Sequence, residues 1–392
     1  MKRLFVQNFG QLKSAEVTFG DLTVFTGPQA SGKSVFLQLF KLLLDKDLVG
    51  DKLRKDSAVW KTKRRADTLR LFSGLYFGEG MGALLDNERL GIKQDGKSVS
   101  LSDLLPRGES ESPETVFYIP AQRVLAFRDG RPRSFSDFAA GDPFCVRNFS
   151  DTIRRLTETD FSDKEILFPR PYLLKETYRK LLERAVFHDF SLKFAVDGNS
   201  RKRLTLAKND TELPFMVWSA GQREFMPLLL GLYWLLPSGK TVKRPDVGFV
   251  VIEEPEMGLH PNATSVVLLL ILELIWRGYK VCLSTHSPHV LDVVWAINTM
   301  IRCNANKKYA LQLFGVDNCF PNYMEVGKVT KAALDKTYKV YYFDVDAGDV
   351  RDISGLDPSA ADAFEAGWGG LTGFSGNVAD VVAQVVREAD RG

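Results

Sequence analysis

This chain of 392 residues has few cysteines and no long apolar run, two features that often indicate the class of a protein. Cysteines are few and far apart, with no C-x-x-C pair, which argues against a zinc ribbon and a disulfide framework. They are Cys145, Cys282, Cys303 and Cys319. The longest apolar run, Ser265–Trp276, contains Glu273 and is too short to span a bilayer. The N-terminus lacks the apolar stretch of a secretory signal. We therefore expect a cytoplasmic protein with no membrane partner.

An excess of charge of one sign is also missing, because the net charge is only +3. Whole-chain charge therefore does not indicate a nucleic-acid-binding protein. Two local clusters, Lys52–Arg65 and Arg123–Arg133, do concentrate positive charge. Solvated helix faces and loops commonly carry such clusters, so nucleic acid stays an alternative partner at either one. Hydrophobic residues make up 45% of the chain, which is enough for two or three domains or for one α/β core with insertions.

The stretch GPQASGKS at residues 27–34 fills the pattern G-x-x-x-x-G-K-[ST]. An apolar strand is predicted before it, at residues 22–25, and a helix after it, at residues 34–44. Gly27 and Gly32 would let main-chain N–H groups turn toward an anion that also faces the positive end of the helix dipole. Lys33 would neutralise the β- and γ-phosphates, and the Ser34 hydroxyl suits Mg²⁺. The pattern predicts a nucleotide phosphate site.

Two adjacent acids end a second apolar strand, which is predicted at residues 247–252. Because the chain turns at a strand end, Glu253 and Glu254 can divide two tasks between them. Glu253 would hold the Mg²⁺ shell, and Glu254 would orient and polarise the attacking water. A pair of exposed surface glutamates is the alternative interpretation.

A second anion-binding helix end is predicted in the stretch VWSAGQREFMPLLL. Ser219 can cap a helix there, and Gly221 would let its N-terminus approach an anion. Two helix ends on separate lobes cannot easily serve one nucleotide. They favour a sandwich in which the glycine loop of one subunit faces the Ser219 region of another. His286, in STHSPHVL, can donate a hydrogen bond to a γ-phosphate, although a lone loop histidine is more often structural.

The remaining pattern alternates strands and helices. Strands are predicted at residues 3–7, 15–19, 68–78, 116–119, 190–196 and 203–207, with a turn at 197–200. Helical spacing runs through residues 147–187, most clearly from 172 onward. Helices at 262–276 and 288–297 flank a strand at 280–283, and two more strands are expected within 338–355. This order favours an α/β fold with a mostly parallel sheet covered on both faces.

Taken in order, the motifs resemble an ABC-type ATPase head of the SMC-like and OLD-like branch of AAA-type ATP-binding proteins. GPQASGKS resembles the Walker A loop, YIPAQR the Q-loop with Gln122, and SAGQRE the signature motif. VVIEEPEMGLHP resembles Walker B with the D-loop, and STHSPHVL the switch-histidine loop. The resemblance covers residues 1 to about 300 and implies a P-loop NTPase core with an inserted helical lobe at about 45–215. Residues 301–392 would complete that core with strands and a terminal helix.

The resemblance also implies ATP and Mg²⁺ as cofactors and hydrolysis of ATP to ADP and phosphate as the activity. The implied catalytic residues are Glu254, His286, Gln122, Ser219 and Gly221. The implied nucleotide contacts are Gly27, Ala30, Ser31, Gly32, Lys33, Ser34 and Val35. The implied Mg²⁺ contacts are Ser34, Gln122 and Glu253. Two positions depart from the family pattern, because Glu253 stands where aspartate is commoner and Ala220 where glycine is usual.

Two parts of the larger family members are not expected here, the long coiled coil of SMC proteins and the C-terminal nuclease of OLD proteins. The acidic residues Asp344, Asp346 and Asp349 are interpreted as a strand end and turn. The chain therefore resembles stand-alone ATPase subunits of bacterial anti-phage systems such as PARIS and Septu. That resemblance implies a homo-oligomer that gates a separate effector protein. The alternative is a DNA-repair or recombination ATPase that clamps duplex DNA, and an ABC transporter ATPase is less favoured.

Overall fold

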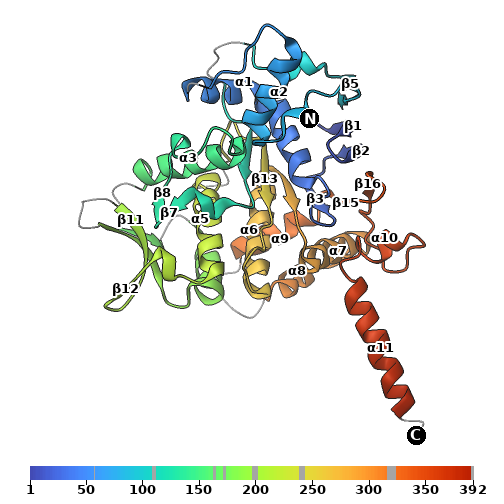
Figure 1. Cartoon of the computed structure of the whole chain (residues 1–392). Coiled ribbons are helices and arrows are strands. Elements are labelled where there is room, and N and C mark those ends of the chain that lie inside the picture. The colour runs from blue at the N-terminus through green and yellow to red at the C-terminus, as the bar shows by residue number, and fades with distance from the viewer. Residues whose placement is uncertain are drawn as a thin grey trace.

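The computed structural model describes residues 1–56, 58–107, 112–161, 165–170, 174–196, 202–237, 243–315 and 324–389. A six-stranded sheet lies at its centre in the order β16-β15-β3-β14-β13-β6 (Figure 1). The strands are β3 (Leu22–Thr26), β6 (Val116–Ile119), β13 (Phe249–Glu253), β14 (Lys280–Ser284), β15 (Tyr338–Phe343) and β16 (Val350–Asp352). Every neighbouring pair is parallel except β15 and β16. The expected α/β fold with a mixed, mostly parallel sheet is confirmed.

Side-chain alternation along the central strands divides the core into two layers. Val24 and Leu283 belong to a cluster that also contains the buried faces of α5 (Ala220–Leu235), α6 (Pro261–Trp276) and α7 (Pro288–Arg302). Their neighbours Phe25 and Cys282 belong to the opposite cluster, with α1 (Lys33–Lys55) and α2 (Arg65–Phe77). Because both faces are covered, these strands read as continuous apolar runs in the sequence.

The rest of the chain adds two antiparallel sheets and further helices. One sheet has the order β2-β1-β4-β5, and the other has the order β12-β11-β10-β9. Their strands are β1 (Arg3–Phe9), β2 (Leu12–Thr18), β4 (Gly91–Gln94), β5 (Lys97–Ser98), β9 (Ile166–Phe168), β10 (Ser191–Val196), β11 (Lys202–Lys208) and β12 (Thr211–Pro214). A small hairpin joins β7 (Phe127–Arg128) and β8 (Arg131–Pro132). The other α-helices are α3 (Phe144–Glu158), α4 (Glu176–Leu182), α8 (Lys308–Leu313), α9 (Met324–Ala333), α10 (Ala363–Ala366) and α11 (Gly373–Ala389).

The prediction of a strand at residues 68–78 is wrong, because helix α2 occupies most of this segment. Leu69, Phe72 and Tyr76 are buried at helical spacing, while Leu71 on the other face is exposed. The dense aromatic and β-compatible composition suggested a strand. Packing of α2 between α1 and α3 selects the helix instead.

Helical spacing across residues 147–187 is only partly confirmed. The helices α3 and α4 are present, but β9 lies between them, and residues 183–187 form a π-helix. The strands predicted at 190–196 and 203–207 are confirmed as β10 and β11. The turn predicted at 197–200 and residue Cys319 lie outside the described residues.

The C-terminal segment contains the two strands expected within 338–355. Asp344 follows β15 and accepts hydrogen bonds from the N–H groups of Asp346 and Ala347 at 3.0 Å each, so the interpretation as strand end and turn is confirmed. The domain boundary near residue 300 stays a prediction. Helix α11 extends away from the rest of the molecule (Figure 1). Within the described ranges, no helix combines the length and apolarity needed to cross a membrane.

Candidate active site

The predicted motifs meet at the carboxyl ends of three adjacent central strands. The glycine loop follows β3, Glu254 follows β13, and His286 comes two residues after β14. The sheet order β3-β14-β13 makes these strands neighbours, and parallel strands end at the same edge. Loops that are far apart in sequence are therefore brought to one place.

The glycine loop has the backbone that a phosphate cradle needs. Gly27 has φ 141°, Gly32 has φ 96° and Ala30 has φ 57°, so three positions lie in the region that disfavours ordinary side chains. A Cβ at Gly27 would lie 2.6 Å from the carbonyl oxygen of Phe343 in β15. Gly27 is thus required both for the turn and for close packing of the loop against the next strand.

Lys33 begins α1 and folds back over the loop. Its Nζ donates to the carbonyl oxygens of Gly27 and Pro28 at 2.8 Å each, and to the Ser31 hydroxyl at 3.1 Å. Burial lowers the pKa of Lys33 to about 8, although the acids Glu254 and Glu253 act in the opposite direction. The ammonium group therefore lies where phosphate oxygens could replace the loop carbonyls as its acceptors.

Glu253 is buried at the end of β13 and is well suited to a metal ion. Its Oε2 accepts from the N–H of Ala121 at 3.2 Å, whereas Oε1 is buried with no hydrogen-bond partner among the described residues. Burial raises the pKa of Glu253, and Ser34 lies close enough to lower it. A buried carboxylate oxygen without a partner, beside a hydroxyl, fits the oxygen ligands that Mg²⁺ prefers. Gln122 is exposed and lies next to Ala121, so its proposed metal contact stays a prediction.

Glu254 adopts an unusual conformation for a non-glycine residue, with φ 45°. Such a backbone costs roughly 1–3 kcal/mol and persists only where the surroundings fix it. Its Oε1 lies 3.5 Å from Nε2 of His286. Burial, followed by the neighbouring Glu256, raises the pKa of Glu254 to about 8. The structure thus brings together the two residues that were predicted to polarise water and to contact a γ-phosphate.

Glu256 was missed by the sequence interpretation, although it lies in the same EEPE stretch. Its Oε1 accepts hydrogen bonds from the Thr285 hydroxyl at 2.6 Å and from the N–H of His286 at 3.0 Å. This carboxylate therefore holds the switch-histidine loop against the turn that follows β13. Burial and the nearby Lys33 lower the pKa of His286, which favours the neutral imidazole at pH 7.

Arg123 was interpreted only as part of a basic cluster that could contact nucleic acid, and its burial contradicts that interpretation. Its guanidinium is fully buried and donates to three main-chain carbonyl oxygens, those of Glu224, Glu253 and Glu254. These partners are visible only in the tertiary structure, because they lie 101 to 131 residues away from Arg123 in sequence. The sequence feature that could have indicated this role is a charged residue shortly after the buried strand β6.

The signature segment forms the predicted helix N-terminus. Ser219 caps α5, its Oγ accepts from the N–H of Gln222 at 3.2 Å, and the Gln222 side chain accepts from the Ser219 N–H. Ser219 and Ala220 are exposed. A Cβ at Gly221 would lie 2.5 Å from the carbonyl oxygen of Gly258, so this glycine allows contact with the D-loop of its own chain. Its role toward an anion stays a prediction.

Comparisons with known proteins agree with the ATPase character of this site. Residues 1–77 match a family model described as an AAA ATPase domain. Residues 117–292 match an AAA-domain model whose description names the AbiEii toxin and a Type IV TA system. The OLD nuclease of Thermus scotoductus is 22% identical over 321 residues, which are 75% of this chain. The chain spans about 60% of the length of that curated relative.

Solved SMC heads are more distant neighbours. The SMC head bound to the C-winged helix domain of ScpA is 10% identical with a TM-score of 0.39, over 74% of this chain and 90% of that chain. A Smc head with an extended coiled coil from Pyrococcus furiosus is 12% identical with a TM-score of 0.32, over 90% and 95% of the two chains. The two matched ATPase-domain models and the OLD relative show that the chain is similar to ATP-binding ATPases of the AAA/ABC type.

Proposed function

We propose that the chain hydrolyses ATP at a site shared between two copies, and that the nucleotide state gates a separate effector protein. The observation that supports this proposal most is the contrast between the glycine loop and the signature helix. The loop, Glu253, Glu254 and His286 meet within one chain. Among the described residues, the Ser219 hydroxyl at the exposed N-terminus of α5 bonds within its own helix. A second copy would place this helix end over the phosphates bound by the first.

In this mechanism, the glycine loop and Lys33 bind the β- and γ-phosphates. Mg²⁺, held through Ser34 and the free oxygen of Glu253, would neutralise phosphate charge. Glu254 orients the attacking water and accepts its proton on a carboxylate oxygen. Neutral His286 donates a hydrogen bond toward the γ-phosphate oxygen. Ser219 of the other copy completes the enclosure and excludes bulk water.

The proposed effector and a role in anti-phage defence rest on family relationships rather than on site chemistry. The model matching residues 117–292 names a toxin–antitoxin system in its description, and the curated relative is a nuclease. Both contexts join an ATPase to a destructive activity. We propose that this chain supplies the ATPase and that another protein supplies the toxic activity.

Mixing two inactive variants tests the shared site. Ser219→Arg should fill the space of the neighbour's γ-phosphate, so it retains ATP binding at Lys33 but loses hydrolysis. Lys33→Ala loses ATP binding. In a head-to-tail dimer of the two, one site contains both defects and the other contains neither, so an equal mixture should regain about a quarter of wild-type turnover.

Asp362→Arg, at the exposed cap of α10, is the matched control for loss of a helix cap and should remain active alone. Tagged co-purification would show that subunits exchange. Free exchange without any recovery of turnover would count against a shared site whose two halves fire independently. ATP hydrolysis by a monomer at the wild-type rate would reject it.

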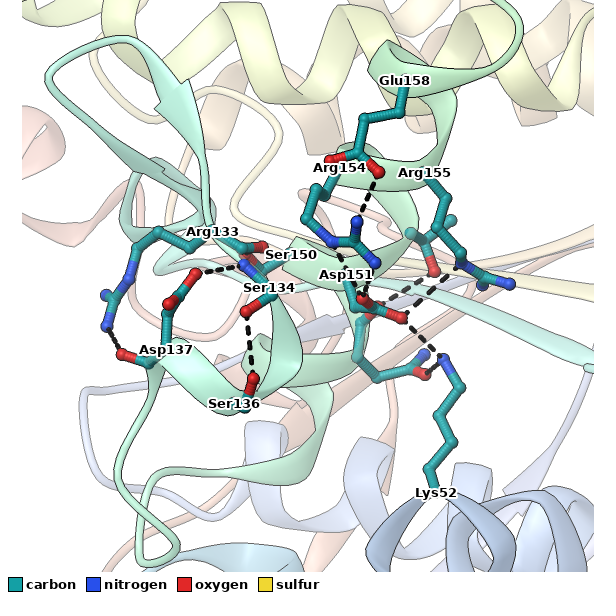
Figure 2. A network of polar contacts seen from close by, with 12 residues as sticks. Lys52, Arg133, Ser134, Ser136, Asp137, Ser150, Asp151, Arg154, Arg155 and Glu158 are labelled. Carbon is teal, nitrogen blue, oxygen red and sulfur yellow. Dashed lines mark hydrogen bonds and ion pairs between the residues drawn. The ribbon is translucent and has the colours of Figure 1, made fainter. Parts of the chain in front are cut away.

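A second function, direct clamping of duplex DNA, is favoured by one of the two basic clusters. Lys55, Lys61, Lys63, Arg64 and Arg65 are exposed, and none has an ion-pair partner in the part of the chain that the structure describes. Lys52 of the same cluster points inward and pairs with Asp151 at 3.8 Å (Figure 2). In the other cluster, Arg133 donates to the Asp137 carbonyl oxygen at 2.5 Å and its guanidinium lies over Phe138. Of the two clusters, residues 55–65 therefore offer more exposed cations, since Arg128 is the one exposed arginine within the described residues 123–133.

Salt dependence separates the two functions. Duplex DNA bound through these cations should lose affinity steeply between 50 and 200 mM salt, because each neutralised phosphate releases counterions. Replacing Lys61, Lys63 and Arg64 by glutamine should reduce that slope by about 3. Absence of binding to a short duplex at low salt would remove this alternative.

A further inference from the structure

We propose that Arg123 is a positioning residue that ties the signature helix α5 to the turn carrying Glu254, so that hydrolysis depends on the placement of α5. This inference rests on the proposed ATP hydrolysis and deepens it. It assigns Arg123 a positioning role, since its buried guanidinium bonds main-chain oxygens.

The contacts of the guanidinium carry the proposal. Nη1 donates to the carbonyl oxygen of Glu253 at 2.9 Å, and Nη2 donates to that of Glu254 at 3.0 Å. Nε donates to the carbonyl oxygen of Glu224 in α5, also at 2.9 Å. One rigid, planar group therefore connects the end of β13 with the second turn of the signature helix.

The Glu254 peptide needs such an anchor because its φ is 45°. Its N–H donates to the Ser284 carbonyl oxygen at 2.9 Å. Its own carbonyl oxygen accepts from Arg123 and from the N–H of Met257 at 3.1 Å. The side chain of Glu254 leaves this strained peptide, so a change in these bonds changes where the carboxylate lies.

A second contact joins α5 to the same turn. The backbones of Gly221 and Gly258 touch, and Gly258 itself has φ 72°. Arg123 and the glycine pair thus hold α5 against both ends of the segment from Glu254 to Gly258. A ligand that moves the N-terminus of α5, such as the phosphates of a nucleotide bound to another copy, would act on the Glu254 turn through these two connections.

The surrounding acids offset part of the cost of burying a guanidinium at this position. Burial lowers the pKa of Arg123, and the acids Glu224, Glu256, Glu254 and Glu253 raise it. Lysine would keep the charge but is a point donor, and it cannot reproduce three bonds in a fixed fork. Arg123→Lys therefore changes the geometry of the connection with the least change in electrostatics.

The test compares Arg123→Lys with Arg147→Lys in the full chain. Arg147 is an equally buried guanidinium that binds Asp56 and the main-chain oxygens of Phe135 and Ala140, away from the ATP motifs. Fluorescent-nucleotide binding and single-turnover hydrolysis are measured for each. Arg123→Lys should bind ATP within about threefold of wild type and hydrolyse it about 10²-fold more slowly. Arg147→Lys should hydrolyse ATP at the wild-type rate.

A double variant distinguishes a positioning role of Arg123 from a general loss of structure, because two residues that act through one another have non-additive effects on the hydrolysis rate. If Arg123 acts through Glu254, adding Arg123→Lys to Glu254→Gln should produce no further loss of rate. A further loss of about 10²-fold in the double variant would overturn the proposal. So would wild-type turnover of Arg123→Lys, or an equal loss in Arg147→Lys.

If Arg123→Lys fails to fold, a variant of α5 tests the same connection. Melting curves establish whether Arg123→Lys folds. Gly221→Ala perturbs the α5 contact with the same turn and should slow hydrolysis about tenfold while ATP still binds. Normal hydrolysis by Gly221→Ala would also overturn the coupling. If the wild-type chain itself hydrolysed no ATP under any nucleotide or assembly condition, the proposed function would fail, and this inference with it.

Discussion

The glycine loop and the signature helix differ in how far their own chain completes them. Around the loop, Lys33 and Glu253 are buried, and the acids after β13 face the histidine after β14. At the signature, Ser219 and Ala220 are exposed and their hydrogen bonds stay within α5. The first region is therefore assembled within one chain, whereas the predicted anion contact of the second would need a partner from outside.

The two regions therefore indicate different kinds of binding partner. A buried oxygen such as Oε1 of Glu253, which has no hydrogen-bond partner among the residues that the structure describes, is consistent with a ligand bound between elements of one chain. An exposed helix end indicates a partner presented from outside. The contacts of α5 with Arg123 and Gly258 then connect the second region to the first. The following variants test whether the two regions separate into ATP binding and ATP hydrolysis.

Glu254→Gln should have the largest effect. It removes the proposed base while keeping the size of the side chain, so hydrolysis should slow by about 10²- to 10⁴-fold with ATP binding retained. Single-turnover hydrolysis with a labelled nucleotide measures the rate, and size-exclusion chromatography should show an assembly trapped by ATP. If turnover were nearly unchanged and Glu253→Gln alone abolished it, the two acids would have the opposite roles.

Lys33→Ala should weaken ATP binding by about 10²-fold or more, because several charge-assisted hydrogen bonds to phosphate are lost together. Equilibrium binding of a fluorescent ATP analogue is the measurement. Lys61→Ala, an exposed lysine outside the glycine loop, is the control and should bind ATP normally. Wild-type affinity in Lys33→Ala would remove the phosphate-loop assignment.

Gly221→Ala and Gly74→Ala place the same methyl group on two helical glycines with opposite surroundings. The Cβ at 221 would meet the Gly258 oxygen at 2.5 Å, whereas nothing lies within 4 Å of a Cβ at 74. Gly221→Ala should therefore destabilise the fold by about 1–3 kcal/mol. Gly74→Ala in α2 should stabilise it by about 0.5–1 kcal/mol. Chemical denaturation checks both, and equal changes would contradict the close contact of α5 with the D-loop.

The last prediction concerns pH, which should change the rate gradually over about two pH units. Because the pKa of Glu254 is raised to about 8, the base is mostly protonated below that pH and becomes competent as the pH rises. The single-turnover rate at saturating ATP should therefore increase by up to about tenfold per pH unit from 6 toward 8 and then level off. Glu254→Gln should show no such rise. A flat wild-type profile over this range would mean that another group, or a lower pKa, governs the reaction.

Sequence reasoning predicted the central strands, which the structure confirms, and the motifs that the structure brings to one edge of the sheet, since both depend on local patterns. The loop at residues 27–34 needs glycines at fixed positions, and buried parallel strands need continuous apolar residues. Residues 68–78 went wrong because aromatic and apolar residues at that density suit either element, and the packing of α2 against α1 and α3 decides between them. The two basic clusters look alike in sequence, yet the cations at 55–65 are exposed whereas Arg123 of the other cluster is buried.

By itself, the sequence determined that the chain has a phosphate loop, paired acids after a buried strand and a capped helix at the signature, because each depends on neighbours within a few residues. Only the tertiary structure decided that Arg123 would clamp Glu253, Glu254 and Glu224, and that Gly221 would meet Gly258. These contacts join segments more than 30 residues apart, and their partners are main-chain atoms. Every residue has the same carbonyl group, so no side-chain pattern can mark which one a buried guanidinium will find.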